Sequence, residues 1–192
     1  MARQKKFTTQ ELFQMTKALL LEHGYEGFSI STLAEKLNVS RGTIYKYFEN
    51  KEDLITEYML YEMNKYLEEL KEIHQFATFD EQLDFLLDVM FRNQELQKLI
   101  EMGRDIPVQD NEKAKLNHEK LEAKHLDLYN NLLSVVRLGQ KQGKVRERIP
   151  EPLVLGFIFQ SIVIPNHFGV PYEEWVKSIK DVIRHGMFKR LN

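Results

Sequence analysis

The chain has 192 residues, of which 43% are hydrophobic, so it can bury a sizeable core in one small and one larger domain. It contains no cysteine, which excludes disulfide frameworks, thiolate metal sites and cysteine nucleophiles. The net charge of -2 hides an uneven distribution: residues 1–50 carry seven basic and five acidic residues, and the remainder carries 20 basic and 24 acidic residues.

The first helix is predicted from a complete start signal. Thr8 is the expected N-cap and Glu11 closes a capping box. Gly24 is expected to end this helix near residue 23. Before it, three basic residues form an arm that either reaches a neighbouring groove or is a solvated terminus: Arg3, Lys5 and Lys6.

Residues 28–51 read as two short amphipathic helices joined by a tight turn, which is the pattern of a helix-turn-helix. Asn38 occupies the turn, where a left-handed backbone is required and asparagine is tolerated. Ser40 is the expected N-cap of the second helix, which we place at about residues 41–47. Polar, basic and small residues in this segment are predicted to contact DNA: Ser31, Ser40, Arg41, Gly42, Thr43, Tyr45, Lys46, Tyr47 and Lys51.

The run from residue 39 to 48, followed by Asn50-Lys51-Glu52-Asp53-Leu54, closely resembles the DNA-binding domain of the TetR family of bacterial transcriptional regulators. The strong match covers roughly residues 8–55, and Asn38 replaces the family's usual glycine. The resemblance implies a three-helix bundle that holds the recognition helix across the major groove. The alternative is a buried helical hairpin with incidental basic residues.

The rest of the chain shows helical spacing with no alternating strand pattern, so we predict an all-α fold of about nine helices. A helix-turn-helix DNA-binding domain is assigned to residues 1–50, and an effector-binding and dimerisation domain to residues 51–192. The expected helices of the second domain span residues 51–74, a segment opened by Thr78 and Glu81, 94–102, 111–142, 151–164 and 173–190.

The two C-terminal helices carry a signal for association. Residues 153–163 are apolar around most of the helical circumference, which favours a partner surface over one face of a monomer. The resemblance implies that this helix pair forms a homodimer, which presents two recognition helices to a pseudo-palindromic operator. The expected interface residues are Leu155, Ile158, Ile162 and Val182. The alternative is a central helix buried within one subunit.

An effector pocket for a small apolar or amphipathic molecule is implied by the resemblance and only weakly by the residues. The candidates, which ordinary core packing explains equally well, are Phe85, Met90, His125, Tyr129, Leu133 and Phe159. His118, Glu122 and His125 share one helix face, but one face alone coordinates a metal poorly, so no metal and no cofactor are predicted.

Two other function classes fit the sequence less well. An enzyme is not expected, because there is no glycine-rich phosphate loop and no serine nucleophile motif. A helical adaptor that binds protein explains the apolar C-terminal helix but not the basic recognition segment. No signal peptide or spanning segment is apparent, so we expect a cytoplasmic, ligand-responsive DNA-binding regulator, most simply a repressor, without a membrane partner.

Overall fold

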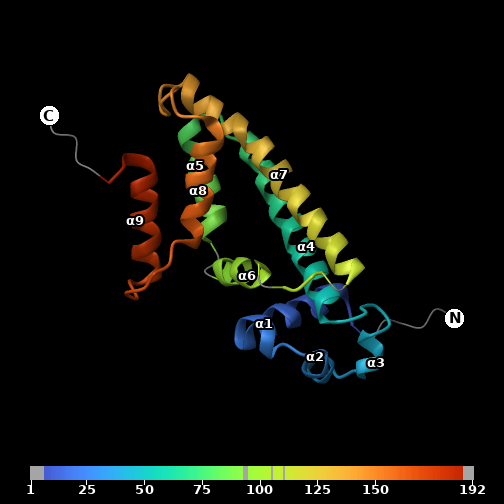
Figure 1. The fold of residues 1–192 in the computed structure, drawn as a ribbon. Coiled ribbons are helices and arrows are strands. Elements are labelled where there is room, and N and C mark those ends of the chain that lie inside the picture. Colours follow the sequence, from blue (N-terminus) through green and yellow to red (C-terminus); the bar gives the residue numbers. More distant parts are fainter. Residues whose placement is uncertain (1–6, 93–94, 105, 110, 188–192) are drawn as a thin grey trace. The chain divides into compact units, whose positions relative to one another are not determined.

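A computed structural model describes residues 7–92, 95–104, 106–109 and 111–187. Throughout these segments the fold is helical and contains no strand. Its α-helices are α1 (Thr9–Gly27), α2 (Ile30–Lys36), α3 (Arg41–Ile44), α4 (Lys51–Leu70), α5 (Phe79–Phe91), α6 (Glu95–Arg104), α7 (Glu112–Lys141), α8 (Glu151–Gln160) and α9 (Tyr172–His185), with 3-10 turns at Lys71–Gln75 and Ser161–Val163 (Figure 1). The prediction of an all-α chain with nine helices is confirmed for the described residues.

The helix starts follow the predicted caps. The Thr8 side chain accepts a hydrogen bond from the Glu11 amide, and the Glu11 carboxylate accepts one from the Thr8 amide. Thr78 and Glu81 form the same reciprocal pair at the start of α5. Each pair satisfies amide donors that the first turn of a helix leaves without partners.

Several predicted helices are shorter than expected, and α8, predicted to reach residue 164, ends at Gln160 before a 3-10 turn. The α-helical part of α3 ends at Ile44, and residues 45–47 continue as a turn. The helix predicted to span residues 51–74 is α-helical only to Leu70, after which the backbone tightens into a 3-10 turn. Gly24 does not end α1 near residue 23 as predicted: its φ of 67° is outside the helical range and kinks the helix, which continues to Gly27.

Contacts divide the chain into two compact units. The first comprises Met1–Tyr66 and Lys98–His125, and the second comprises Leu67–Gln97 and Leu126–Asn192. Both α4 and α7 therefore contribute residues to each unit. The division at residue 50 that the sequence suggested is a functional one and stays a prediction.

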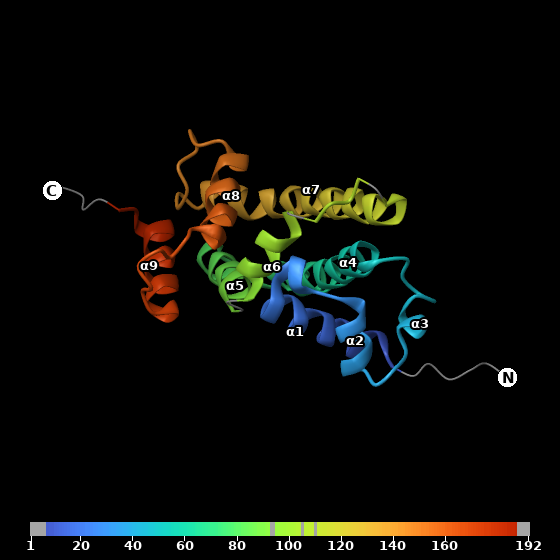
Figure 2. The ribbon, with the colours of Figure 1, turned by 60° about the horizontal axis from the view of Figure 1, so that its bottom comes forward.

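The core of the first unit holds the helix-turn-helix together with later parts of the chain. Its fully buried members include Leu33, Ile44, Leu54 and Ile55. Ala114, at the start of α7, belongs to the same cluster. Figure 2 shows α1, α2 and α3 on one side of α4. The recognition segment is thus supported by residues more than 60 positions away in sequence.

The second unit packs around α5, whose buried face includes Leu83, Leu86, Leu87 and Met90. Gly139 of α7 lies against the ring of Phe79, and a Cβ at Gly139 would lie 2.7 Å from that ring. Only glycine permits this close crossing.

Charged pairs attach α9 to α5. Lys180 donates to Asp88 at 2.5 Å, and Arg184 pairs with Asp84.

Of the described helices, none is both long enough and apolar enough to cross a membrane.

Candidate nucleic-acid interface

The turn between α2 and α3 has the geometry that the sequence predicted. Asn38 adopts a φ of 52°, in the left-handed region. The Asn38 amide donates to the Glu35 carbonyl at 2.9 Å, and the Val39 amide donates to the Ala34 carbonyl at 2.9 Å. These bonds end α2 and redirect the chain into α3, so the predicted turn is confirmed.

Local side-chain contacts order the start of α3. Ser40 occupies the N-cap position with an extended backbone, but its hydroxyl bonds the Thr43 hydroxyl at 2.9 Å instead of a backbone amide. The Arg41 guanidinium donates to the Ser31 hydroxyl of α2 at 3.5 Å. This contact joins two predicted DNA-binding residues from different helices.

The predicted DNA-binding side chains lie mostly on the surface of the first unit. Ile44 of α3 is completely buried, which sets the orientation of the helix. Tyr45 and Tyr47 remain 53% and 42% exposed, and Arg41 and Lys46 are also exposed. The remaining members are exposed at Ser31, Ser40 and Gly42 and partly exposed at Thr43. An apolar anchor beneath a polar and basic surface suits groove binding.

Lys51 makes contacts inside the first unit. Its ammonium donates to the Tyr25 carbonyl at 3.3 Å and lies 4.0 Å above the centre of the Tyr25 ring. Burial raises the pKa of Tyr25, and its hydroxyl donates to Glu52, which further favours the neutral phenol. A phosphate contact by Lys51 must therefore share its ammonium with Tyr25, and it stays a prediction. The predicted basic arm lies outside the described residues.

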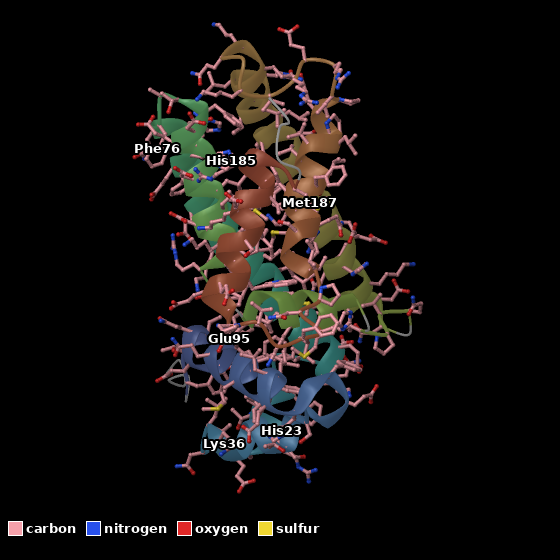
Figure 3. All side chains as sticks on the ribbon, turned by 90° about the vertical axis from the view of Figure 1, so that its left-hand side faces the viewer. His23, Lys36, Phe76, Glu95, His185 and Met187 are labelled. Atoms are coloured by element: carbon pink, nitrogen blue, oxygen red, sulfur yellow. The ribbon has the colours of Figure 1, made fainter. Side chains whose placement is uncertain are left out.

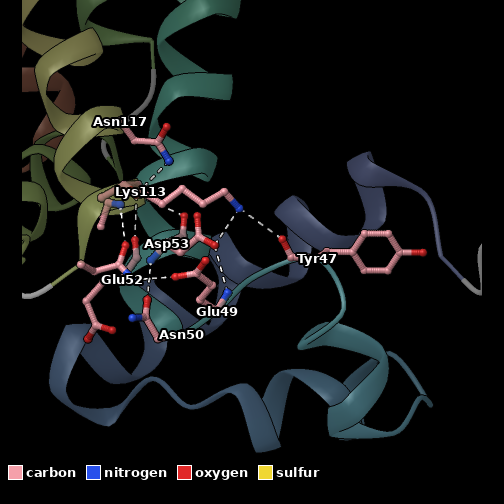
Figure 4. Close-up of polar contacts among 10 residues, drawn as sticks. Tyr47, Glu49, Asn50, Glu52, Asp53, Lys113 and Asn117 are labelled. Atoms are coloured by element: carbon pink, nitrogen blue, oxygen red, sulfur yellow. Dashed lines mark hydrogen bonds and ion pairs between the residues drawn. The ribbon is translucent and has the colours of Figure 1, made fainter.

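A polar cluster behind the recognition segment was missed by sequence reasoning. Lys113, in the first turn of α7, pairs with the buried Asp53 of α4 at 2.9 Å (Figure 4). Asn111 donates to Glu49 at 3.3 Å, and Asn117 donates to the Thr56 hydroxyl at 3.3 Å. The only sequence signal is Asp53 itself, a carboxylate that lies three residues after the Asn50 cap and directly before the apolar residues Leu54 and Ile55.

Comparisons with known proteins agree with this geometry. Residues 12–58 match the model of bacterial regulatory proteins of the tetR family. The fatty acid metabolism regulator protein of Bacillus subtilis is 24% identical over 165 residues, which cover 83% of this chain and 82% of that protein.

Solved structures share the fold along nearly the whole chain. FadR from Bacillus subtilis, solved in complex with stearoyl-CoA, aligns with a TM-score of 0.68 and 20% identity over 94% of this chain and 100% of FadR. AibR, solved with isovaleryl coenzyme A and operator DNA, aligns with a TM-score of 0.70 and 16% identity over 93% of this chain and 98% of AibR.

Residues 12–58 are therefore similar to the DNA-binding domain of the tetR family of bacterial regulatory proteins. The similar proteins whose names describe a function, the fatty acid metabolism regulator protein and FadR, are regulators. The similarity accounts for the exposed recognition segment but does not by itself place an effector or dimer contacts.

The predicted effector residues separate into several environments. Tyr129 and Phe159 are in ring contact, with their centres 4.9 Å apart. Phe85 instead contacts Phe76 at 5.2 Å, and Met90 is fully buried. Leu133 is half-buried, whereas His125 belongs to the first unit and is exposed. Open cavities of about 380 and 430 Å³ are present in the first unit, and neither is lined by any of the six.

The predicted dimer residues require a correction. Leu155 and Ile158 are 1% and 5% exposed, so they belong to the core of their own subunit and cannot form a surface. The outward side of α8 instead presents Leu153 and Phe157, which are 50% and 71% exposed. Ile162 is partly exposed and Val182 is 42% exposed. The sequence could not separate the buried side of α8 from its exposed side, because both sides carry apolar residues.

The C-terminal part of the second unit carries further exposed apolar side chains. Phe168, in the loop before α9, is 96% exposed. Met187, which is labelled just beyond α9 in Figure 3, is 76% exposed. Within the described residues, no three histidine or acidic side chains are arranged to hold a metal ion, and this includes the His118 face of α7.

Proposed function

We propose that this protein is a repressor that binds a pseudo-palindromic operator as a homodimer in the cytoplasm and is released by an acyl-CoA-type effector. The observation that carries the proposal is the recognition segment: Arg41, Tyr45 and Lys46 are exposed around a helix that Ile44 anchors from beneath. Arginine and lysine side chains bond phosphates and base edges, and tyrosine adds a hydroxyl and a flat ring.

A homodimer supplies the second recognition helix that a pseudo-palindrome requires. The exposed apolar side chains Leu153, Phe157 and Val182 support a dimer surface on α8 and α9. Side chains of this size are costly to leave in water, and a matching copy would cover them.

The effector class is suggested by what two similar proteins hold. FadR was solved with stearoyl-CoA and AibR with isovaleryl coenzyme A. An acyl-CoA joins an apolar chain to an anionic head, which agrees with the amphipathic effector expected from the sequence. We place the acyl chain among the apolar side chains of the second unit, near the ring pair of Tyr129 and Phe159.

A binding experiment tests the proposal in two stages. Fluorescence anisotropy with duplexes from the DNA flanking the protein's own gene should show tighter binding than an unrelated duplex of equal length. Stearoyl-CoA should then weaken that binding by about 5-fold to 150-fold, as is typical of linked sites, and free coenzyme A should not.

Linkage gives the second stage an internal check. Calorimetric titration of stearoyl-CoA should give a dissociation constant that rises by the same factor when operator DNA is present. Equal constants with and without DNA would refute the gating mechanism. Failure of any flanking duplex to outcompete the unrelated one would refute operator binding itself.

A further inference from the structure

Lys113 connects the start of α7 to the segment that follows the recognition helix. Its ammonium donates to the Asp53 carboxylate at 2.9 Å and to the Tyr47 backbone carbonyl at 3.4 Å (Figure 4). These partners lie 60 and 66 residues earlier in the chain. In the same view the Tyr47 ring points away from Lys113, so the contact leaves that side chain on the outer surface.

Asp53 extends this connection to a second point of the segment. Its side chain is completely buried, and the oxygen that pairs with Lys113 also accepts the Glu49 amide at 3.0 Å. The Asp53 amide donates to the Asn50 side chain at 2.9 Å. The other carboxylate oxygen has no hydrogen-bond partner among the described residues. A buried carboxylate in this setting depends on its cation, because an unpaired charge is expensive to bury.

The segment held in this way is the connection between α3 and α4. It begins at Tyr45 and ends at Asn50, so it includes the predicted DNA-contacting residues Tyr45 and Lys46. Lys113 also lies 5.8 Å from the centre of the buried Phe48 ring. The hydrogen bond to Asp53 raises the pKa of Lys113, so its ammonium stays charged at neutral pH.

We propose that Lys113 is a positioning residue for DNA binding, which holds residues 45–50 in the DNA-competent arrangement through Asp53 and the Tyr47 carbonyl. The regulatory part of this inference rests on the proposed function. Helix α7 has 30 residues, and from Leu126 onward they belong to the second unit. An effector-induced shift or rotation of α7 would therefore carry Lys113 away from both oxygens and release the segment.

Amide exchange tests the positioning role without DNA. Full-length K113M should lose protection at the Glu49 amide by roughly tenfold relative to the wild type, because the carboxylate that holds this amide loses its cation. K115M is the matched control: it removes the same charge two residues later, from an exposed side chain with no hydrogen bond or ion pair in the described part of the chain. Equal protection of Glu49 in K113M and the wild type would overturn the inference.

DNA affinity separates positioning from general stability. K113M should bind the flanking-gene duplex roughly tenfold more weakly, and its affinity for an unrelated duplex should fall no more than that of K115M. The double variant D53N/K113M leaves no buried charge, so it should regain thermal stability while specific DNA binding stays weak. It also provides a folded protein if K113M alone unfolds.

Recovery of specific binding together with stability in D53N/K113M would show that the pair is merely structural and would overturn the inference. Equal weakening by K113M and K115M would do the same, since it would reduce Lys113 to one surface charge among others. If the wild type fails to discriminate between the two duplexes, the proposed function fails, and the exchange at Glu49 still decides whether Lys113 holds the segment.

Discussion

Phe157 and Ile158 are neighbours on α8 with opposite expected roles. Phe157 is 71% exposed in the single chain, whereas Ile158 is 5% exposed. If the outward side of α8 pairs with a second copy, truncating Phe157 weakens the dimer and leaves each subunit folded. A charge at Ile158 instead enters the core of the subunit, so I158D should unfold the second unit and not merely separate two folded copies.

The expected size of the effect of F157A follows from its exposed surface. A phenylalanine side chain has about 200 Å² of surface, so an exposed fraction of 71% corresponds to about 140 Å². At about 25 cal/mol per Å², burying it contributes about 3.5 kcal/mol per copy. In a two-fold interface both copies lose this contribution. Alanine keeps part of the contact, and the free-energy costs of association offset part of the contribution from buried area. We therefore expect a net loss of about 4 kcal/mol, or roughly a thousandfold in dimer affinity.

Sedimentation velocity over a range of protein concentrations measures the dimer constant, and circular dichroism verifies the fold. L126A is the control, because Leu126 is also an exposed apolar residue, at 64%, but lies on α7. It should leave the dimer constant within about twofold of the wild type. An F157A protein that dimerises as tightly as L126A would refute the placement of the interface on the outward side of α8.

Three further predictions concern the recognition segment, the turn at Asn38 and the cap of α5. Y45A should weaken operator binding by roughly 1 to 3 kcal/mol in a mobility-shift assay with an unchanged circular dichroism spectrum, and unaltered affinity would contradict the placement of Tyr45 at the DNA. N38V should be less stable to urea than N38G by about 1 to 2 kcal/mol, because a branched side chain disfavours the left-handed turn at Asn38; equal stabilities would contradict that geometry. The Thr78 hydroxyl, and to a smaller extent the Thr78 amide, donates to the Glu81 carboxylate and holds the pKa of Glu81 below its ordinary value of 4.5. The ionised carboxylate therefore stabilises the fold above pH 4.5, and this stabilisation is lost as the pH falls through the lowered pKa. The loss of unfolding free energy in E81Q should therefore be seen near neutral pH and shrink under acid, and a pH-independent difference would count against the capping role.

Sequence alone determined the features that depend on neighbouring residues. The capping boxes at Thr8 and Thr78 and the left-handed turn at Asn38 each involve groups within a few positions of one another. Their energetics are set by local backbone geometry and short-range hydrogen bonds, so the residue types and their spacing were enough to predict them. The burial of Ile44 and the exposure of the polar residues around it were predictable for the same reason, because their spacing places them on opposite faces of a short helix. Their contact with DNA stays a prediction.

Only the tertiary structure decided which side of an apolar helix faces inward and which distant charges meet. Leu155 and Phe157 are equally apolar in sequence, and their exposure differs because only one side of α8 packs on its own unit. Lys113 and Asp53 are 60 residues apart, and no local pattern relates them. Such contacts form only when the core assembles. Loop lengths and helix directions decide which distant groups come together, and the local spacing of residues does not specify them.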